Sequence, residues 1–314
     1  MESLARELRR RVLGRPTLAA LTGALAIAFS GILYRYAEVS PETGAFFRCL
    51  FALPPLWLLT RREDAHLGPR GRRARWFAWG AGAFLAVDLL LWHHSIEAVG
   101  AGLATVLANM QVVLVGVMAW ALLGERPAVR SLAAIPIAVA GIVLISGVLE
   151  TDAYGDNPEL GAVLGVSAGL AYSVFLLTLR HGSQDVRRVA GPLFDVTLAA
   201  AIVIVPAGLV AGTLDFMPPL ESAAWLALLA LTSQVVGWLL ISVSLTRLPA
   251  VVTSILLTLQ PVGSVLFAAA LLDERPSILQ LAGTAAILAG LVVASAGRGR
   301  EHSTAQARAE APAG

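Results

Sequence analysis

The chain has 314 residues, of which 57% are hydrophobic and 14% are charged, and its mean hydropathy is +0.75. So little polar surface excludes a soluble two-domain protein and indicates a place in a lipid bilayer, while a dispersed net charge of +2 argues against nucleic-acid binding. A single cysteine, Cys49, leaves neither a disulfide framework nor a thiolate metal site.

Ten apolar segments, each bounded by charges, glycine or proline, are long enough to cross the hydrocarbon core as helices. In chain order they cover residues 17–36, 41–60, 75–96, 100–123, 129–148, 160–180, 190–212, 222–245, 248–272 and 277–297. The arginine-rich stretch "RELRRRVLGR" ahead of them is similar to the charged part of a signal peptide. The apolar run behind it is too long for that role, and a retained first helix is predicted.

Arginines in the connections predict the orientation, because positively charged loops stay on the cytoplasmic side. Both terminal segments and one alternating set of loops carry 20 arginines together, whereas the opposite set carries only Arg275. Both termini are therefore predicted to face the cytoplasm, in a cytoplasmic (inner) membrane of bacterial type with lipid as a partner. The tail "RGREHSTAQARAEAPAG" is polar and rich in small residues, and it is predicted to be disordered.

An internal repeat organises the chain. A shift of 149 residues aligns 76–147 with 225–296 without a gap and gives 24 identities in 72 positions. Five helices per copy is an odd number, so the second copy enters the membrane from the opposite side. We predict an all-α integral membrane protein with ten transmembrane helices in two inverted-topology repeats. Its parts are a cytoplasmic segment at 1–16, a first repeat at 17–148, an extracytoplasmic linker at 149–159, a second repeat at 160–297 and a cytoplasmic tail at 298–314.

The hexapeptides "LLGERP" at 122–127 and "LLDERP" at 271–276 belong to this repeat. Their Glu and Arg are interpreted as the exit from the membrane, and their Pro as the first turn of the next helix, where a missing N–H costs little. The predicted topology places the first hexapeptide on the cytoplasmic side and the second on the outer side.

With these halves in place, the sequence resembles the drug/metabolite transporter superfamily, in its EamA branch of ten-helix bacterial exporters. The resemblance rests on the two halves, on the paired hexapeptides and on the "AVAGIVLISG" and "ILAGLVVASAG" helices that follow them, and it covers residues 17–297. It implies a secondary transporter that exports amino acids, other small metabolites or toxic compounds and is driven by an ion or substrate gradient. Phe29-Ser30 stands where many members carry Trp-Ser.

Inverted repeats are themselves typical of transporters, because two oppositely oriented copies can open one central site alternately to each side. Export of an amino acid or related compound is the first hypothesis. A multidrug or toxic-compound exporter and a passive facilitator are the alternatives within the same fold. An intramembrane enzyme would need a nucleophile with its base, a ligand set or paired acids, and no such motif is found. The sequence predicts a small-molecule substrate and a proton or other coupling ion as partners, with no cofactor, resident metal or nucleic acid.

Ionisable side chains at membrane depth are functional candidates, since hydrocarbon does not tolerate them without a partner. Arg48 and Asp88 are predicted at similar depth, roughly 10 Å below the outer surface, and are expected to form an ion pair. That pair is read either as packing or as part of proton coupling. His93, near the outer end of its helix, is a further coupling candidate because histidine titrates near neutral pH. Asp195 is expected to reach the interface or to pair with Arg187 or Arg188.

Polar and aromatic side chains on symmetry-related helices are predicted to line a central cavity, where amides and a hydroxyl hold polar groups and tryptophans enclose an apolar part. For any single amide, an interhelical hydrogen bond is the alternative. The substrate candidates are Asp88, Trp92, Asn109, Gln111, Tyr172, Gln234, Trp238, Thr258 and Gln260. The hinge candidates are Pro54, Pro206 and Pro261, because proline removes a backbone hydrogen bond. A glycine ridge at 161, 165 and 169 is predicted to be a packing or sliding surface, with a substrate role as the second interpretation.

Overall fold

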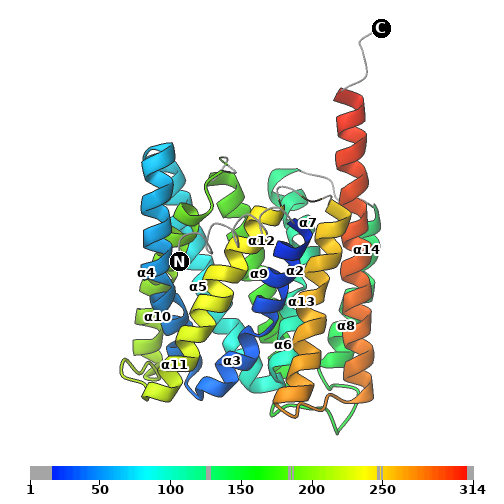
Figure 1. The fold of residues 1–314 in the computed structure, drawn as a ribbon. Helices are drawn as coiled ribbons and strands as arrows, with labels where there is room; N and C mark the ends of the chain where they lie inside the picture. Colours follow the sequence, from blue (N-terminus) through cyan, green and yellow to red (C-terminus); the bar gives the residue numbers. More distant parts are fainter. Residues whose placement is uncertain are drawn as a thin grey trace.

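The computed structural model describes residues 16–124, 129–182, 185, 187–245, 248 and 250–309, with side chains except at 123, 129–131, 244–245, 250–257 and 295–309. Every regular element within these ranges is a helix. Seven helical stretches are long and apolar enough to cross a membrane. Three shorter apolar helices accompany them, at Leu132–Ile145, Thr258–Leu271 and Ile278–Ala294. Figure 1 shows the helices running side by side along one direction.

Helical structure is found over each of the ten predicted segments. The first half contains α2 (Pro16–Ala28), α3 (Ser30–Ala37), α4 (Pro41–Leu67), α5 (Arg72–Val99), α6 (Ala101–Ala108), α7 (Gln111–Leu123) and α8 (Val129–Ile145). The second half contains α9 (Pro158–Gly182), α10 (Ala190–Ala211), α11 (Leu220–Leu229), the π-helix η1 (Ala230–Gly237), α12 (Trp238–Leu245), α13 (Ala250–Leu271) and α14 (Ile278–Ala309). α14 runs to Ala309, through most of the segment predicted to be disordered, where Ala, Arg, Glu and Gln favour a helix.

Three segments predicted as single helices are interrupted. The first breaks at Phe29, between α2 and α3, and the fourth breaks at Asn109 and Met110, between α6 and α7. The eighth contains the π-helix η1, in which backbone hydrogen bonds reach one residue further along the chain. None of these interruptions contains a proline. α4, α10 and α13, which carry the predicted hinge prolines, are continuous.

Equivalent helices of the two halves make equivalent contacts with the opposite half. α4 packs on α10 and α8 packs on α14, so the second helix of each half meets its counterpart, and so does the fifth. α5 packs along α9, and α2 packs along η1 and α12, so the third helix of each half meets the first helix of the other. A two-fold relation between repeats produces this pattern of contacts.

Small residues permit the closest approaches. A Cβ atom built on Gly141 of α8 would lie 2.7 Å from the carbonyl oxygen of Gly283 on α14, and the reverse substitution would bring 2.6 Å. The predicted packing ridge on α9 is confirmed, because Cβ atoms on Gly161, Gly165 and Gly169 would meet α5 and α6 at 2.5 to 2.7 Å. Such contacts let helix backbones touch directly in a membrane bundle.

Glu274, in the second hexapeptide, has a different role from the predicted exit marker. Its side chain is only 4% exposed and accepts hydrogen bonds from the backbone N–H groups of Ala101 (2.6 Å) and Gly102 (3.1 Å). The carboxylate therefore caps the start of α6, in the other half, where unpaired N–H groups and the helix dipole attract an anion. Burial raises the pKa of Glu274, while these two donors oppose the shift. The first hexapeptide's Glu-Arg-Pro lies outside the described residues.

Replacing Glu274 by Ala is expected to lower the free energy of unfolding by about 2 kcal/mol, because two buried amides lose a charged acceptor. Chemical unfolding of the purified protein in detergent measures this loss. Arg275→Ala, at the exposed neighbouring position, is the control and should change stability by less than about 0.5 kcal/mol. Equal effects of the two substitutions would contradict the capping role.

Candidate functional site

Arg48 lies on α4 and is buried, with 5% of its surface exposed. Its Nε–H donates to Gln234 Oε1 at 3.1 Å, and its Cζ lies 5.5 Å from the centroid of the Trp92 ring. Gln234 is fully buried in η1, and its Nε2 donates onward to Thr197 Oγ1 at 3.3 Å. A guanidinium in the membrane interior is thus held by an amide from the other half and by an aromatic face.

The predicted ion pair between Arg48 and Asp88 does not form in the described structure. The two side chains interact electrostatically, but the Arg48 contacts go to Gln234 and Trp92 instead. Asp88 is 7% exposed on α5, and none of its oxygens has a hydrogen-bond donor among the described residues. The prediction is wrong because helix periodicity gives the depth of a residue but leaves open which helix of the other half supplies its partner.

Aromatic side chains border these two charges. Tyr172 and Phe175 on α9 both contact Trp238, with ring centroids 5.9 Å and 5.6 Å apart. Tyr172 also interacts electrostatically with Asp88 and Arg48. The structure thereby brings six of the predicted site residues, five of them substrate candidates, into one cluster, which we call the central cluster. Its members are Arg48, Asp88, Trp92, Tyr172, Gln234 and Trp238, with Arg48 taken from the coupling candidates.

Backbone irregularities surround the central cluster. Ser30 and two serines of the other half donate to the carbonyls before the break in the first helix. These bonds are Ser233 to Ala26 at 3.0 Å, Ser30 to Ile27 at 2.6 Å and Ser264 to Ala28 at 2.9 Å. Hydroxyl groups that bond to a helix carbonyl bend the helix, and here they also satisfy carbonyls that the break releases.

Two predicted site residues, Asn109 and Gln111, lie at the interruption of the fourth helix. Asn109 is buried, and its Nδ2 donates to the carbonyl of Thr105 at 2.8 Å, so this amide supports its own helix end. Gln111 begins α7 half-buried, and its backbone carbonyl accepts from Ser173 Oγ at 3.4 Å. Thr258 and Gln260 are half-buried on α13. Contact of any of these four side chains with substrate stays a prediction.

The hinge candidates differ in their surroundings. Pro54 and Pro206 are exposed on the outside of the bundle, whereas Pro261 is buried on α13. Their helices continue past them, and a hinge role stays a prediction. His93 is fully buried between the rings of Tyr34 and Trp92, at 4.3 and 5.0 Å.

His94, next to His93, is the histidine that reaches a carboxylate. Its Nε2 lies 2.9 Å from Glu42 Oε1, and Thr213 Oγ1 donates to Glu42 Oε2 at 2.7 Å. These contacts join α4, α5 and the connection after α10 at the predicted outer end. His94 therefore has a carboxylate partner at this end, whereas neither ring nitrogen of His93 has a hydrogen-bond partner among the described residues.

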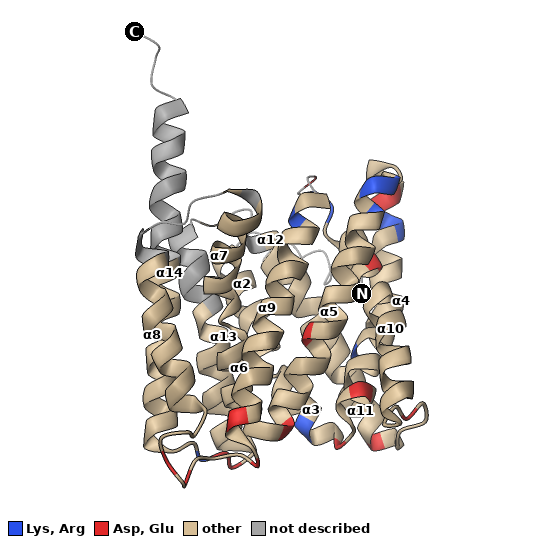
Figure 2. Ribbon diagram, turned by 180° about the vertical axis from the view of Figure 1, so that it is seen from behind, with Lys and Arg blue, Asp and Glu red and all other residues tan. Residues whose placement is uncertain are grey.

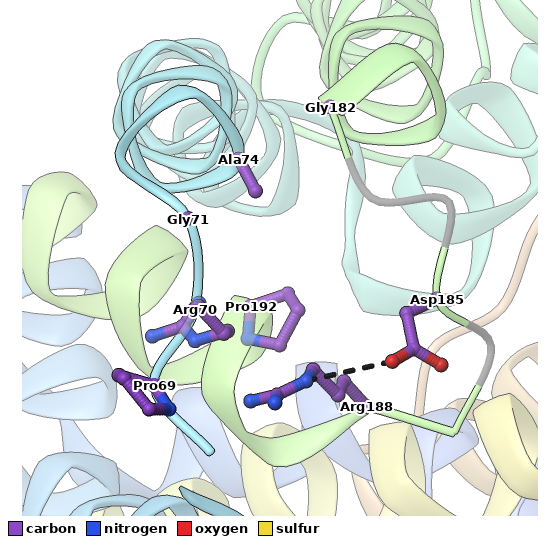
Figure 3. Close-up of a pocket in the computed structure, with 8 residues that line it drawn as sticks. All are labelled: Pro69, Arg70, Gly71, Ala74, Gly182, Asp185, Arg188 and Pro192. Carbon is purple, nitrogen blue, oxygen red and sulfur yellow. Dashed lines mark ion pairs between the residues drawn. The ribbon is translucent and has the colours of Figure 1, made fainter. Parts of the chain in front are cut away.

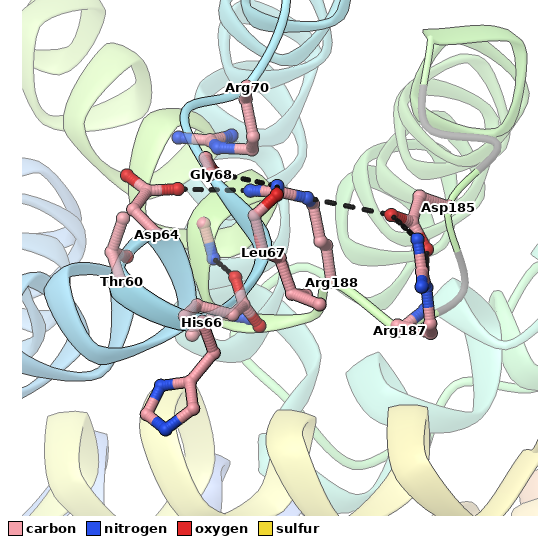
Figure 4. Close-up of polar contacts among 12 residues, drawn as sticks. Thr60, Asp64, His66, Leu67, Gly68, Arg70, Asp185, Arg187 and Arg188 are labelled. Carbon is pink, nitrogen blue, oxygen red and sulfur yellow. Dashed lines mark hydrogen bonds and ion pairs between the residues drawn. The ribbon is translucent and has the colours of Figure 1, made fainter.

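A cavity of about 220 Å³ lies at the other end of the bundle, between the α4–α5 and α9–α10 connections (Figure 3). Arg70 on its wall pairs with Asp195, at 2.9 Å from Nη2 to Oδ2, and Arg75 Nε lies 3.5 Å from the same oxygen. Of the two expectations for Asp195, pairing with Arg187 or Arg188 is wrong, because its partners are Arg70 and Arg75, and reaching the interface stays a prediction. Arg188 is held instead by Asp64 and by the carbonyls of Leu67 and Gly68, as Figure 4 shows. Because internal contacts occupy these arginines, the cavity is a junction between loops.

Sequence reasoning missed the residues that hold the site together. Thr197, Ser233 and Ser264 are buried hydroxyls whose partners lie in other helices, and small hydroxyl residues are common throughout apolar helices. Their only signal in the sequence is a hydroxyl in the middle of an apolar segment.

The chain matches one known family model. The model described as the EamA-like transporter family matches residues 15–147 and 159–296, one match for each repeat. No curated protein matches the chain. A solved structure titled only "Crystal structure of protein" aligns with a TM-score of 0.60 and 16% identity, covering 89% of this chain and 96% of that one. At that identity the likeness concerns the fold alone.

Replacing Gln234 by Leu is expected to lower the free energy of unfolding by about 2 kcal/mol, because buried Arg48 loses its hydrogen-bond acceptor. Adding Arg48→Met should recover part of the loss, and a double-mutant cycle should give a coupling energy of about 1 kcal/mol. Unfolding in detergent measures all four proteins. Gln260→Leu, a half-buried amide on another helix, serves as the control. Strict additivity of the Gln234 and Arg48 substitutions would contradict the contact.

Proposed function

Because the chain belongs to the EamA-like transporter family, we propose that it exports a small zwitterionic metabolite across the cytoplasmic membrane, with an amino acid as the first candidate. Family and apolar helices together make it a multi-pass membrane transporter of the drug/metabolite type. One observation supports the substrate class. Arg48 and Asp88 are opposite charges on neighbouring helices, nearly enclosed, and they do not pair with each other within the described structure.

A zwitterion offers each of these groups the partner it lacks. Gln234 engages Nε of Arg48, so the two terminal guanidinium nitrogens face no acceptor among the described residues. A carboxylate would bind that fork, and an ammonium group would bind Asp88. Trp92, Tyr172 and Trp238 would then border the apolar part of the substrate. Gln234 becomes a positioning residue in this proposal, since its amide is used up by Arg48 and Thr197.

Alternating access around this cluster is the proposed mechanism, with ten membrane crossings and both termini in the cytoplasm. Figure 2 supports the orientation, because its blue segments gather where α4 ends and its red segments gather mainly at the opposite end. At that opposite, outer end, polar contacts join helices of the two halves to each other and join α3 to α5 within the first half. Tyr36 donates to the carbonyl of Leu271 at 3.0 Å, Tyr34 donates to Glu97 at 2.8 Å, and Glu274 caps α6. These contacts support a conformation that is closed toward the outside.

Export of a cationic toxic compound is the second candidate. Asp88 beside Tyr172, whose ring contacts Trp238, favours it, because an anion next to aromatic rings binds organic cations. Arg48 over the Trp92 ring argues against it, since a fixed positive charge already occupies that face. A passive facilitator has the same site without ion coupling. Counterflow with and without a pH gradient separates it from a coupled carrier.

Uptake of radiolabelled amino acids and cationic drugs into proteoliposomes tests the substrate class. A neutral amino acid should be transported, and Arg48→Gln and Asp88→Asn should each reduce its uptake about tenfold or more, since each removes one charged contact. Arg275→Gln is the control and should transport normally. If Asp88→Asn lowers amino-acid uptake but leaves the pH profile of the residual uptake unchanged, Asp88 binds substrate and does not carry the coupled proton. Drug transport that survives Arg48→Gln would favour the second candidate.

Sidedness is tested by single cysteines in a protein lacking Cys49, which is buried. A membrane-impermeant maleimide applied to whole cells should label Arg275→Cys and should label Arg126→Cys only after the cells are opened. Labelling of both positions from one side would exclude inverted repeats. An unreactive control comes from Cys49 itself in the otherwise unaltered chain.

A further inference from the structure

At the α4–α5 hairpin, four arginines are exposed, whereas the acidic side chains bind other parts of the protein. Arg61 and Arg62 near the end of α4, and Arg72 and Arg73 at the start of α5, are all exposed. None of these four side chains has an ion-pair partner among the described residues. Arg75 and Arg70, in contrast, turn toward Asp195.

The acidic residues of the same hairpin, Glu63 and Asp64, bind the start of α10 and the connection before it. Glu63 accepts hydrogen bonds from the backbone N–H groups at the start of α10, at 2.7, 2.9 and 2.8 Å for residues 189 to 191. Asp64 accepts from Arg188 Nη1 at 3.0 Å, as Figure 4 shows. Both nearby carboxylates are thus committed to contacts inside the bundle, and the exposed arginines keep an uncompensated positive charge.

Two exposed tryptophans lie one helical turn from these arginines. Both are further from the hairpin connection and therefore closer to the middle of the predicted membrane span. Trp57 is 47% exposed and precedes Arg61 by four residues, with the Arg61 Cζ 5.3 Å from its ring centroid. Trp76 is 65% exposed and follows Arg72 by four residues. Four helical residues span about 6 Å, so each helix sets an arginine about 6 Å above a tryptophan. This is the order of headgroup and interface in a leaflet, where tryptophan gathers at the boundary.

Helix stability does not account for this arrangement. Arginines at the start of α5 face the positive end of the helix dipole, where cations are unfavourable, and α5 begins without a side-chain cap or an acidic residue in its first turn. Packing does not account for it either, because the six side chains are exposed.

We propose that this arginine–tryptophan face, made of Trp57, Arg61, Arg62, Arg72, Arg73 and Trp76, binds anionic phospholipid headgroups in the leaflet next to the hairpin. Guanidinium groups bind lipid phosphates through their planar fork, and the two indole rings lie at the level of the acyl carbonyls. The face thereby selects phosphatidylglycerol-type lipids over zwitterionic ones. This property is independent of the substrate proposed for the central cluster.

Lipid titration of the full chain in detergent tests the proposal. Acyl-labelled phosphatidylglycerol and acyl-labelled phosphatidylcholine are titrated separately, and energy transfer from tryptophan reports binding. The unaltered protein should bind phosphatidylglycerol at least fivefold more tightly. Arg61→Gln with Arg72→Gln should lose fivefold or more of that preference, since each arginine at an anionic surface contributes about a factor of five. Arg61→Lys with Arg72→Lys should keep most of it, and this variant keeps the test open if the glutamine variant does not fold.

Two controls decide between a local face and general charge. Arg187→Gln with Arg275→Gln removes two exposed arginines elsewhere and should leave the lipid preference unchanged. Equal losses in both double variants, or no loss in the Arg61/Arg72 variant, would overturn the proposal. Complete displacement of the lipid by inorganic phosphate at matched ionic strength would also overturn it, because the site would then bind free anions.

Discussion

Backbone groups inside a hydrocarbon layer must be satisfied within the protein, and this constraint shapes the centre of the bundle. Where the first helix breaks, Ser233 and Ser264 of the other half donate to the carbonyls of Ala26 and Ala28. At this break the donors come from the other half, so the irregular backbone of the first helix lies where the two halves meet. The same junction holds Arg48 and Asp88, so irregular backbone and buried charge share one location.

Buried charges must also be satisfied within the protein, because burying an ion without partners costs more free energy than burying an unpaired amide. The Glu274 carboxylate accepts hydrogen bonds from two backbone amides, and the Arg48 guanidinium contacts one amide oxygen and one aromatic ring. Neither set of contacts includes a counter-ion. Arg48 and Glu274 are thus tied across the two halves without being neutralised, and for Arg48 this leaves charge available to a ligand.

Much of the fold was predictable, because apolar length, arginine distribution and a repeat are one-dimensional signals. All ten segments are helical, and the family resemblance is confirmed by a match to both halves. The site was predictable as a set of residues but not as a set of contacts. The prediction paired Arg48 with Asp88 by depth, whereas its partner Gln234 lies 186 positions away on a helix that pattern alone does not orient. The breaks at Phe29 and Asn109 were missed because neither contains proline. The groups that bond to the carbonyls beside them are serines of the other half at the first break and the Asn109 amide itself at the second.

Symmetry of the fold contrasts with asymmetry of the site. In the repeat alignment Asp88 corresponds to Gly237 and Gln234 corresponds to Leu85. The position equivalent to each polar residue therefore carries no polar side chain in the other half. The third helix is a regular helix around Asp88, whereas its counterpart is a π-helix around Gln234. Both charges therefore belong to the first half, and the amide that fixes Arg48 belongs to the second. In the proposed alternating-access mechanism, an exchange of conformation between the halves would alter the contact from Arg48 to Gln234 and so link the position of the guanidinium to the opening of the site.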